Sequence, residues 1–346
     1  MRNLLTAFLI VLLIAVPVNA EEWTIPEVPS SSREWMPETT ETFTDGLWEL
    51  LCGILPKIQP AMTEAVRTCL SIVGAVLLTS MVRGFRSASG KTADLAGSIV
   101  IGLLLFGASG SMIALGTETV REISDYGKLL LPVMTSAMAA SGGVSASGAL
   151  YLGTAFFDSV LSTAITALLI PLIYVFLALG VANAALGEDI LNQMKDFVKW
   201  LVTWVLKTLL YVFTGYMGIT GVISGTTDAA AMKATKLTIS GVVPVVGGIL
   251  SDATEAVLVG ADTVRNAMGI YGLLAVLAIW IGPFLQIGAQ YLTLKLTGAV
   301  CNIFGSKSTV GLIKDFTSAM GLLLAMTGSV CLMLLVSTVC FMKGVG

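Results

Sequence analysis

Residues 130–136 read LLPVMTS, and residues 242–248 read VVPVVGG. Each of these apolar runs contains one proline, and each proline is followed 39 residues later by a second one, at Pro171 and Pro283. Internal repeats of this kind are a common way of building helical membrane proteins. The two runs therefore predict that the membrane region contains two related copies.

A third landmark recurs in the same order. A Lys-Asp-Phe tripeptide lies at 195–197 and again at 314–316. We infer one copy over residues 129–224 and a second over residues 241–346, which includes a final transmembrane helix. Residues 225–240 are expected to be the linker between the copies.

Each copy begins with a segment that is unusual for a transmembrane helix. The run that starts at Leu129 is soon interrupted by two adjacent glycines, and another short segment, 145–157, follows at once. Because a span needs about 20 apolar residues, we expect a short helical hairpin broken by proline and glycine. It is either re-entrant at membrane depth or amphipathic on the membrane surface. The candidate pore-lining or gating residues are Pro132, Gly142, Gly143, Pro244, Gly247 and Gly248.

Composition places the whole chain in a membrane. Of the 346 residues, 55% are hydrophobic and 12% are charged, against about 25% charged in ordinary soluble proteins. This balance excludes disordered chains, and a net charge of −3 leaves no polybasic surface for nucleic acid. The expected fold class is all-α: a polytopic helical membrane protein with an internal two-fold repeat, in contact with the lipid bilayer.

The N-terminus has the pattern of a signal peptide. Arg2 precedes an apolar run, and small residues end at Ala20 just before two glutamates. We expect residues 1–20 to be a signal peptide, with an uncleaved first transmembrane helix as the alternative. Residues 21–60, which are acidic and rich in proline, are then an exported juxtamembrane region.

Two transmembrane helices are expected in residues 61–128. The loop between them carries Arg83, Arg86 and Lys91, and such basic loops remain in the cytoplasm. This orientation agrees with an exported N-terminus.

The relative orientation of the two copies depends on the number of crossings between them. Two crossings make the copies parallel and three make them inverted. Lys233 and Lys236 favour a cytoplasmic connection and hence inversion, but both arrangements stay open.

Isolated charges interrupt the apolar stretches. They are Asp158, Asp252, Asp262 and Lys295. A charge at the centre of a membrane helix costs about 3 kcal/mol, so each needs a partner or water. These charges form either a polar pathway through the membrane or a set of interfacial and structural pairs.

Catalytic signatures are missing from the sequence. The chain has no histidine, which excludes histidine-based triads and histidine zinc sites. Its five cysteines form no CxxC pair. We expect no enzyme activity, no cofactor and no metal site.

The stretches Leu129–Tyr151 (LLLPVMTSAMAASGGVSASGALY) and Lys236–Ala261 (KLTISGVVPVVGGILSDATEAVLVGA) resemble the stage III sporulation protein AE family. The resemblance extends from about Leu47 to the C-terminus. It implies a role in endospore formation, within a complex made in the mother cell and inserted in the outer membrane around the forespore.

With a forespore channel protein, the stage III sporulation A complex is thought to connect the two cells and to support late forespore development. The resemblance therefore implies a membrane-embedded subunit of a secretion-like channel complex, whose partners are the other subunits. It supplies no catalytic residues. The alternatives are an independent, ion-coupled secondary transporter with inverted repeats and an assembly platform without a conduit.

Overall fold

A computed structural model describes residues 26–38, 42–85, 90–242 and 247–343, with side chains placed except at 55, 83–94 and 221–261. These residues form helices and connecting turns, and the described ranges contain no β-strand, which confirms the all-α prediction. After the short 3₁₀ helix η1 (Arg33–Trp35), the helices are α2 (Phe43–Cys52), α3 (Ile54–Phe85), α4 (Gly90–Ala140), α5 (Val144–Thr163), the π-helical turn η2 (Ala164–Leu169), α6 (Ile170–Leu186), α7 (Asp189–Val242), α8 (Gly247–Cys301) and α9 (Lys307–Lys343).

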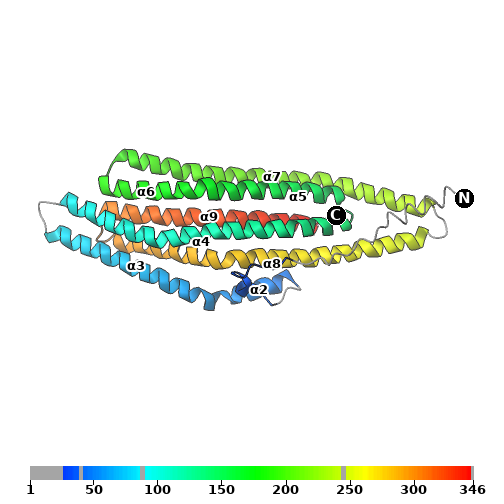
Figure 1. Cartoon of the computed structure of the whole chain (residues 1–346), viewed down its shortest axis with the longest axis horizontal. Helices are drawn as coiled ribbons and strands as arrows, with labels where there is room; N and C mark the ends of the chain where they lie inside the picture. The colour runs from blue at the N-terminus through cyan, green and yellow to red at the C-terminus, as the bar shows by residue number, and fades with distance from the viewer. Residues whose placement is uncertain (1–25, 39–41, 86–89, 243–246, 344–346) are drawn as a thin grey trace.

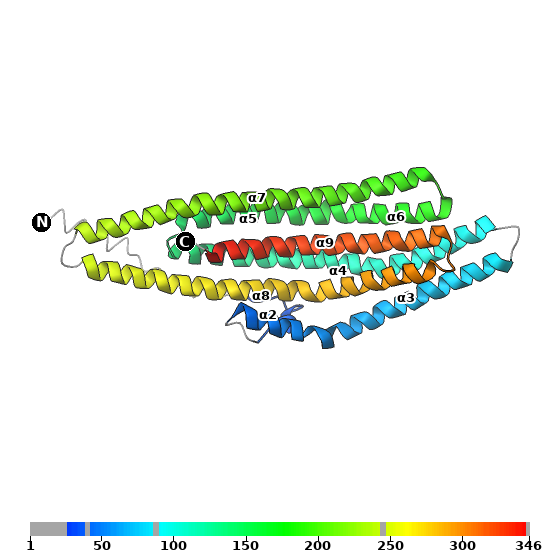
Figure 2. The same ribbon diagram turned by 180° about the vertical axis from the view of Figure 1, so that it is seen from behind.

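Helix α9 is the central element of the bundle. It runs between α5–α6 on one side and α8 on the other, and it packs extensively on α8 and α4 (Figure 1). The view from behind places α9 in front of α4, with α7 above it and α8 below (Figure 2). Most of α9 is buried, including Phe316, Leu323 and Leu334. The hydrophobic core of the bundle is therefore built around this helix.

Close contacts fix the directions of the neighbouring helices. Gly116 and Gly127 of α4 lie against Leu323 and Leu334 of α9, so these two helices are parallel. Gly102 of α4 lies against Val181, so α5–α6 runs in the opposite direction to α4.

Contacts also fix the directions of α7 and α8 relative to α9. Lys195 and Lys199 of α7 meet Asp315 and Ser318, so α7 is parallel to α9, and α8 is antiparallel to it. The segments α5–α6–α7 and α8–α9, which correspond to the two predicted copies, thus run in the same direction. This arrangement excludes the inverted one for these helices, and residues 225–240, the predicted linker, continue α7 as helix.

Among the described residues, six helical segments are long and apolar enough to cross a membrane, and the chain is a helical multi-pass membrane protein. They lie in α3, α4, α5–α6, α7, α8 and α9. At 1.5 Å per residue, α4 is roughly 75 Å long, whereas the hydrocarbon core is about 30 Å thick. A single bilayer crossing therefore accounts for only part of this helix.

The composition of α4 changes along its length. Residues 95–116 are apolar, whereas Glu118, Arg121 and Asp125 point outward from the next turns while Val120 and Ile123 are buried. This alternation is the pattern of an amphipathic helix beside water. Residues 118–128 of α4 therefore form a stretch with a charged outer face.

The predicted first hairpin is only partly correct. Gly142 has φ 94°, a left-handed value that favours glycine, and its turn separates α4 from α5 as expected. The arms are not short helices, however, because Pro132 lies inside the 51-residue α4 and α5 continues through η2 into α6. The polar stretch 117–128 is part of the same helix, because it buries an apolar face that includes Val120 and Ile123.

The second hairpin is described less completely. Pro244 lies in 243–246, outside the described residues. Gly247 and Gly248 are the first residues of α8. The re-entrant geometry predicted for both copies remains a prediction.

Two glycines of α5 make a matched test of the packing. A Cβ atom on Gly153 would lie 1.9 Å from Cε1 of Tyr216, whose hydroxyl is held by the carbonyl of Ala149. A Cβ on Gly148 would meet nothing within 4 Å. We expect Gly153→Ala to lower the melting temperature of the purified protein, whereas Gly148→Ala leaves it unchanged or raises it, since alanine favours helix by about 1 kcal/mol. Equal melting temperatures for the two variants would contradict this packing.

The two halves of α4 can be distinguished by labelling. Leu103 is 68% exposed in the apolar half, and Asp125 is exposed on the charged face. In a variant without native cysteines, reconstituted in nanodiscs, we expect a membrane-impermeant maleimide to label Asp125→Cys rapidly and Leu103→Cys poorly. Similar labelling rates would show that both positions have the same surroundings.

Candidate functional site

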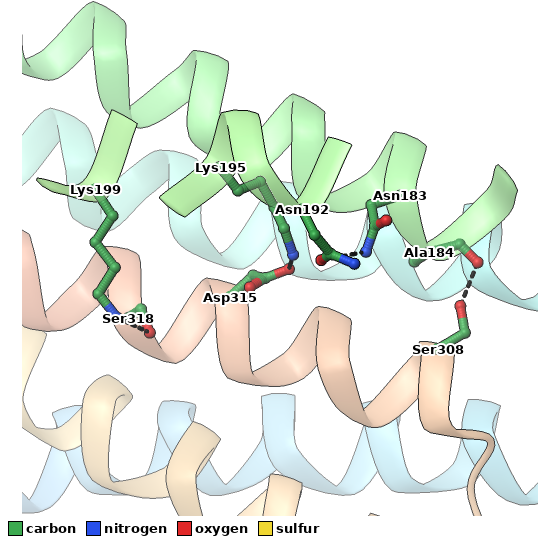
Figure 3. Close-up of polar contacts among 8 residues, drawn as sticks. All are labelled: Asn183, Ala184, Asn192, Lys195, Lys199, Ser308, Asp315 and Ser318. Atoms are coloured by element: carbon green, nitrogen blue, oxygen red, sulfur yellow. Dashed lines mark hydrogen bonds and ion pairs between the residues drawn. The ribbon is translucent and has the colours of Figure 1, made fainter. Parts of the chain in front are cut away.

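A buried ion pair joins α7 to the central helix. The Nζ atom of Lys195 donates to Oδ2 of Asp315 at 2.6 Å, and the side chains are 8% and 18% exposed (Figure 3). Gly180 of α6 makes room for the carboxylate, because a Cβ there would lie 3.1 Å from Oδ2. Three helices therefore meet at this pair.

Further polar contacts lie on both sides of the pair. Lys199 donates to the hydroxyl of Ser318 at 3.4 Å, and Asn183 donates its amide to Oδ1 of Asn192 at 2.9 Å (Figure 3). The hydroxyl of Ser308 donates to the carbonyl of Ala184. Together these contacts connect α6, α7 and α9 near the turn between α6 and α7.

The pair arises from the two Lys-Asp-Phe tripeptides. In α7 the lysine of the tripeptide is buried and Asp196 and Phe197 are exposed. In α9 the lysine, Lys314, is exposed, while the aspartate faces α7 and Phe316 packs edge-on against Phe106 of α4. The first tripeptide thus supplies the cation and the second supplies the anion.

Exposed lysines also lie on α7, α8 and α9. We call Lys199 of α7, Lys295 of α8, and Lys307 and Lys314 of α9 the lysine strip. Residues seven apart lie on one face of a helix, so Lys307 and Lys314 share the open face of α9. Farther along the same face are the exposed residues Ala325 and Leu332. The open face of α9 is therefore basic at one end and apolar at the other.

The other flank of α7 is aromatic. The ring centroids of Phe197 and Trp200 are 5.9 Å apart, and those of Trp200 and Trp204 are 6.1 Å apart. All three side chains are more than half exposed. Exposed tryptophans of this kind suit the interface between lipid and water. Helix α7 thus presents an aromatic flank to lipid and a polar flank toward α9.

The lysine strip lies on helices that are expected to cross a membrane, and this limits what can lie next to it. Charged side chains facing hydrocarbon are costly, so they face water or another protein. The strip is consequently the surface of the described chain best suited to a water-filled passage or to a partner subunit.

The isolated charges predicted from the sequence do not form one site. Asp158 is buried between α5 and α4, where its Oδ2 accepts a hydrogen bond from Ser124 at 2.6 Å. Asp262 pairs with Arg265 one turn away, at 2.9 Å. Lys295 lies 5.7 Å from the ring centroid of Tyr291. Asp252 belongs to α8, with its side chain outside the described set.

Two of these charges lie far apart along one helix. Asp262 and Lys295 lie on the same helix, roughly 50 Å apart at 1.5 Å per residue. Asp262 has a local partner in Arg265, and both readings of these charges stay predictions. Lys295 is the one of these positions that belongs to the lysine strip.

The ion pair between Lys195 and Asp315 was not predicted, although both tripeptides were recognised. Their recurrence was the available signal, but sequence periodicity does not reveal which residue of each tripeptide faces the bundle. That orientation is set by long-range packing, such as Phe316 on Phe106.

The energetics of the pair can be measured with single and double variants. We expect Lys195→Met or Asp315→Asn to destabilise the protein by about 3–5 kcal/mol, because each leaves a buried group without its partner. The double variant Lys195→Met/Asp315→Leu should lose less than the sum, as measured by unfolding in detergent. The control Lys128→Met, which removes the exposed pair with Asp125, should cost under about 1 kcal/mol. Equal losses in the Lys195 and Lys128 variants would contradict a structural role for the buried pair.

Comparisons with known proteins agree with the residues that suggested the family. The family model of stage III sporulation protein AE matches residues 46–344. The stage III sporulation protein AE of Bacillus subtilis (strain 168) is 21% identical over 261 residues, which cover 75% of this chain and 59% of that protein. The chain thus spans about three-fifths of the length of this curated relative, and no solved structure matches. The chain belongs to the stage III sporulation protein AE family.

Proposed function

We propose that this chain is a membrane-embedded subunit of a channel complex between the mother cell and the forespore, where it is needed for late forespore development. The observation that carries the proposal is the lysine strip, a basic surface on helices that otherwise present apolar side chains. Such a surface requires water or a protein partner. Membership of a sporulation family supplies the cellular setting.

The proposed location is the mother-cell membrane around the forespore, with the N-terminal region exported. Helix α9 begins at Lys307, at the end of the bundle where α3 ends and α4 begins (Figure 1). Arg83 lies near the end of α3, and Lys91 lies near the start of α4. Basic residues concentrated at one end support a cytoplasmic placement of that end.

The proposed partners are the other subunits of the stage III sporulation A complex and, through them, a forespore channel protein. The lysine strip is open on the described chain, which supports its use as a lining of the conduit or as a contact with a neighbouring subunit. Family membership supports the choice of complex.

The internal repeat is proposed as the basis of this architecture. Its support is the common direction of α5–α6 and α8, and of α7 and α9, together with an ion pair between the two Lys-Asp-Phe tripeptides. A permease built from inverted repeats receives no support, because these segments are parallel. The hairpin residues Pro132, Gly142, Gly143, Pro244, Gly247 and Gly248 remain the proposed gating elements.

The lysine strip gives a direct functional test. We expect the variant Lys199→Gln/Lys295→Gln/Lys314→Gln, introduced into the producing cell, to lose heat-resistant spores and late forespore reporter expression while reaching normal membrane levels. Lys128→Gln, which removes an exposed lysine of α4, should sporulate normally. Normal sporulation of the triple variant would overturn the proposed role of the strip.

A further inference from the structure

A cavity of about 630 Å³ lies between α3, α4 and α8, on a different side of the bundle from the lysine strip. Its lining includes Lys57 and Glu64 of α3, Met112 of α4 and Gln290 of α8, and its outer wall includes Trp35 of η1. Neither the predicted sites nor the proposed function uses this cavity.

Two features of the sequence create the space. Pro60, inside α3, lacks a backbone N–H, so the helix loses one backbone hydrogen bond beside the cavity. Gly282 of α8 allows the indole of Trp35 to approach, since a Cβ there would lie 2.7 Å from Nε1. Lys57 holds the wall in place, because its Nζ lies 4.8 Å from the Trp35 ring centroid and donates to the carbonyl of Glu34.

The cavity contains polar groups without partners in the described chain. Gln290 is 5% exposed, and its Nε2 atom has no hydrogen-bond partner among the described residues. The exposed side chain of Glu64 lines the opening, and no ion pair joins it to another described side chain. A buried amide without an acceptor costs about 1–3 kcal/mol. An occupant that accepts from the amide and donates to the carboxylate would remove this cost.

The position of the cavity along α4 indicates what kind of ligand it binds. Its α4 lining ends at Met112, and the charged face of α4 begins less than two turns later, at Glu118. The cavity therefore lies where the apolar half of the helix ends, which is the level of lipid headgroups. Apolar side chains, including Met112 and Leu285, form the rest of its wall.

We propose that this cavity binds the headgroup of a zwitterionic aminophospholipid, of the phosphatidylethanolamine type. Phosphate or ester oxygens accept hydrogen bonds from the Gln290 amide and from Lys57. The ammonium group pairs with Glu64. An anionic headgroup without an amine would leave this carboxylate unpaired and close to a second negative charge, which disfavours it.

The test uses the purified full chain in detergent with equal amounts of phosphatidylethanolamine and phosphatidylglycerol, and retained lipid is measured by native mass spectrometry. We expect preferential retention of phosphatidylethanolamine by the unmodified protein. Glu64→Gln should remove the preference, and Gln290→Leu should lower retention of both lipids.

Glu118→Gln, on the exposed face of α4, is the matched control and should behave like the unmodified protein. Melting temperatures show that each variant is folded. Equal retention of the two lipids by the unmodified protein, an unchanged preference in Glu64→Gln, or a peptide in place of lipid would overturn the proposal.

Discussion

A charged side chain that faces hydrocarbon is costly, so the charged stretches on the long helices of this bundle must face water or another protein. Helix α4 is more than twice as long as a bilayer core is thick. Its outer face is apolar from Leu95 to Gly116 and charged from Glu118 to Lys128. Helix α9 makes the opposite change, from Lys307 and Lys314 at its start to the apolar side chains of its second half. Polar surfaces therefore lie on different helices at different levels of the same bundle.

The buried ion pair is the consequence of this constraint inside the protein. Lys195 and Asp315 lie at a level where α4 and α6 are apolar, so neither charge can be left without a partner. Their pairing holds α7 beside α9, and that placement brings Lys199 to the same open face as Lys314. The lysine strip thus depends on an interaction that is itself hidden from solvent.

Much of the fold could be predicted from the sequence, because hydrophobic composition and length determine which segments form membrane helices. The glycine turn at Gly142 was also predictable, since its left-handed backbone favours glycine. The length of α4 was not, because the polar stretch after Gly116 becomes helical only by packing Val120 and Ile123 on distant helices. The buried ion pair was harder to predict. The partner of Lys195 lies 120 residues away in the sequence, and the pattern of a single sequence does not show which distant residues are in contact.

The most direct measurement of the central claim compares Lys314 of α9 with Leu103 of α4, two exposed positions that lie near the same level of the bundle because Phe316 packs on Phe106. Each position is replaced by cysteine and spin-labelled in the full chain reconstituted in nanodiscs. Collisions with a water-soluble nickel complex and with oxygen then report whether the label is surrounded by water or by lipid. The account predicts that the label at position 314 collides mainly with nickel and the label at position 103 mainly with oxygen. Oxygen-dominated collisions at both positions would place the lysine strip in lipid and contradict the account.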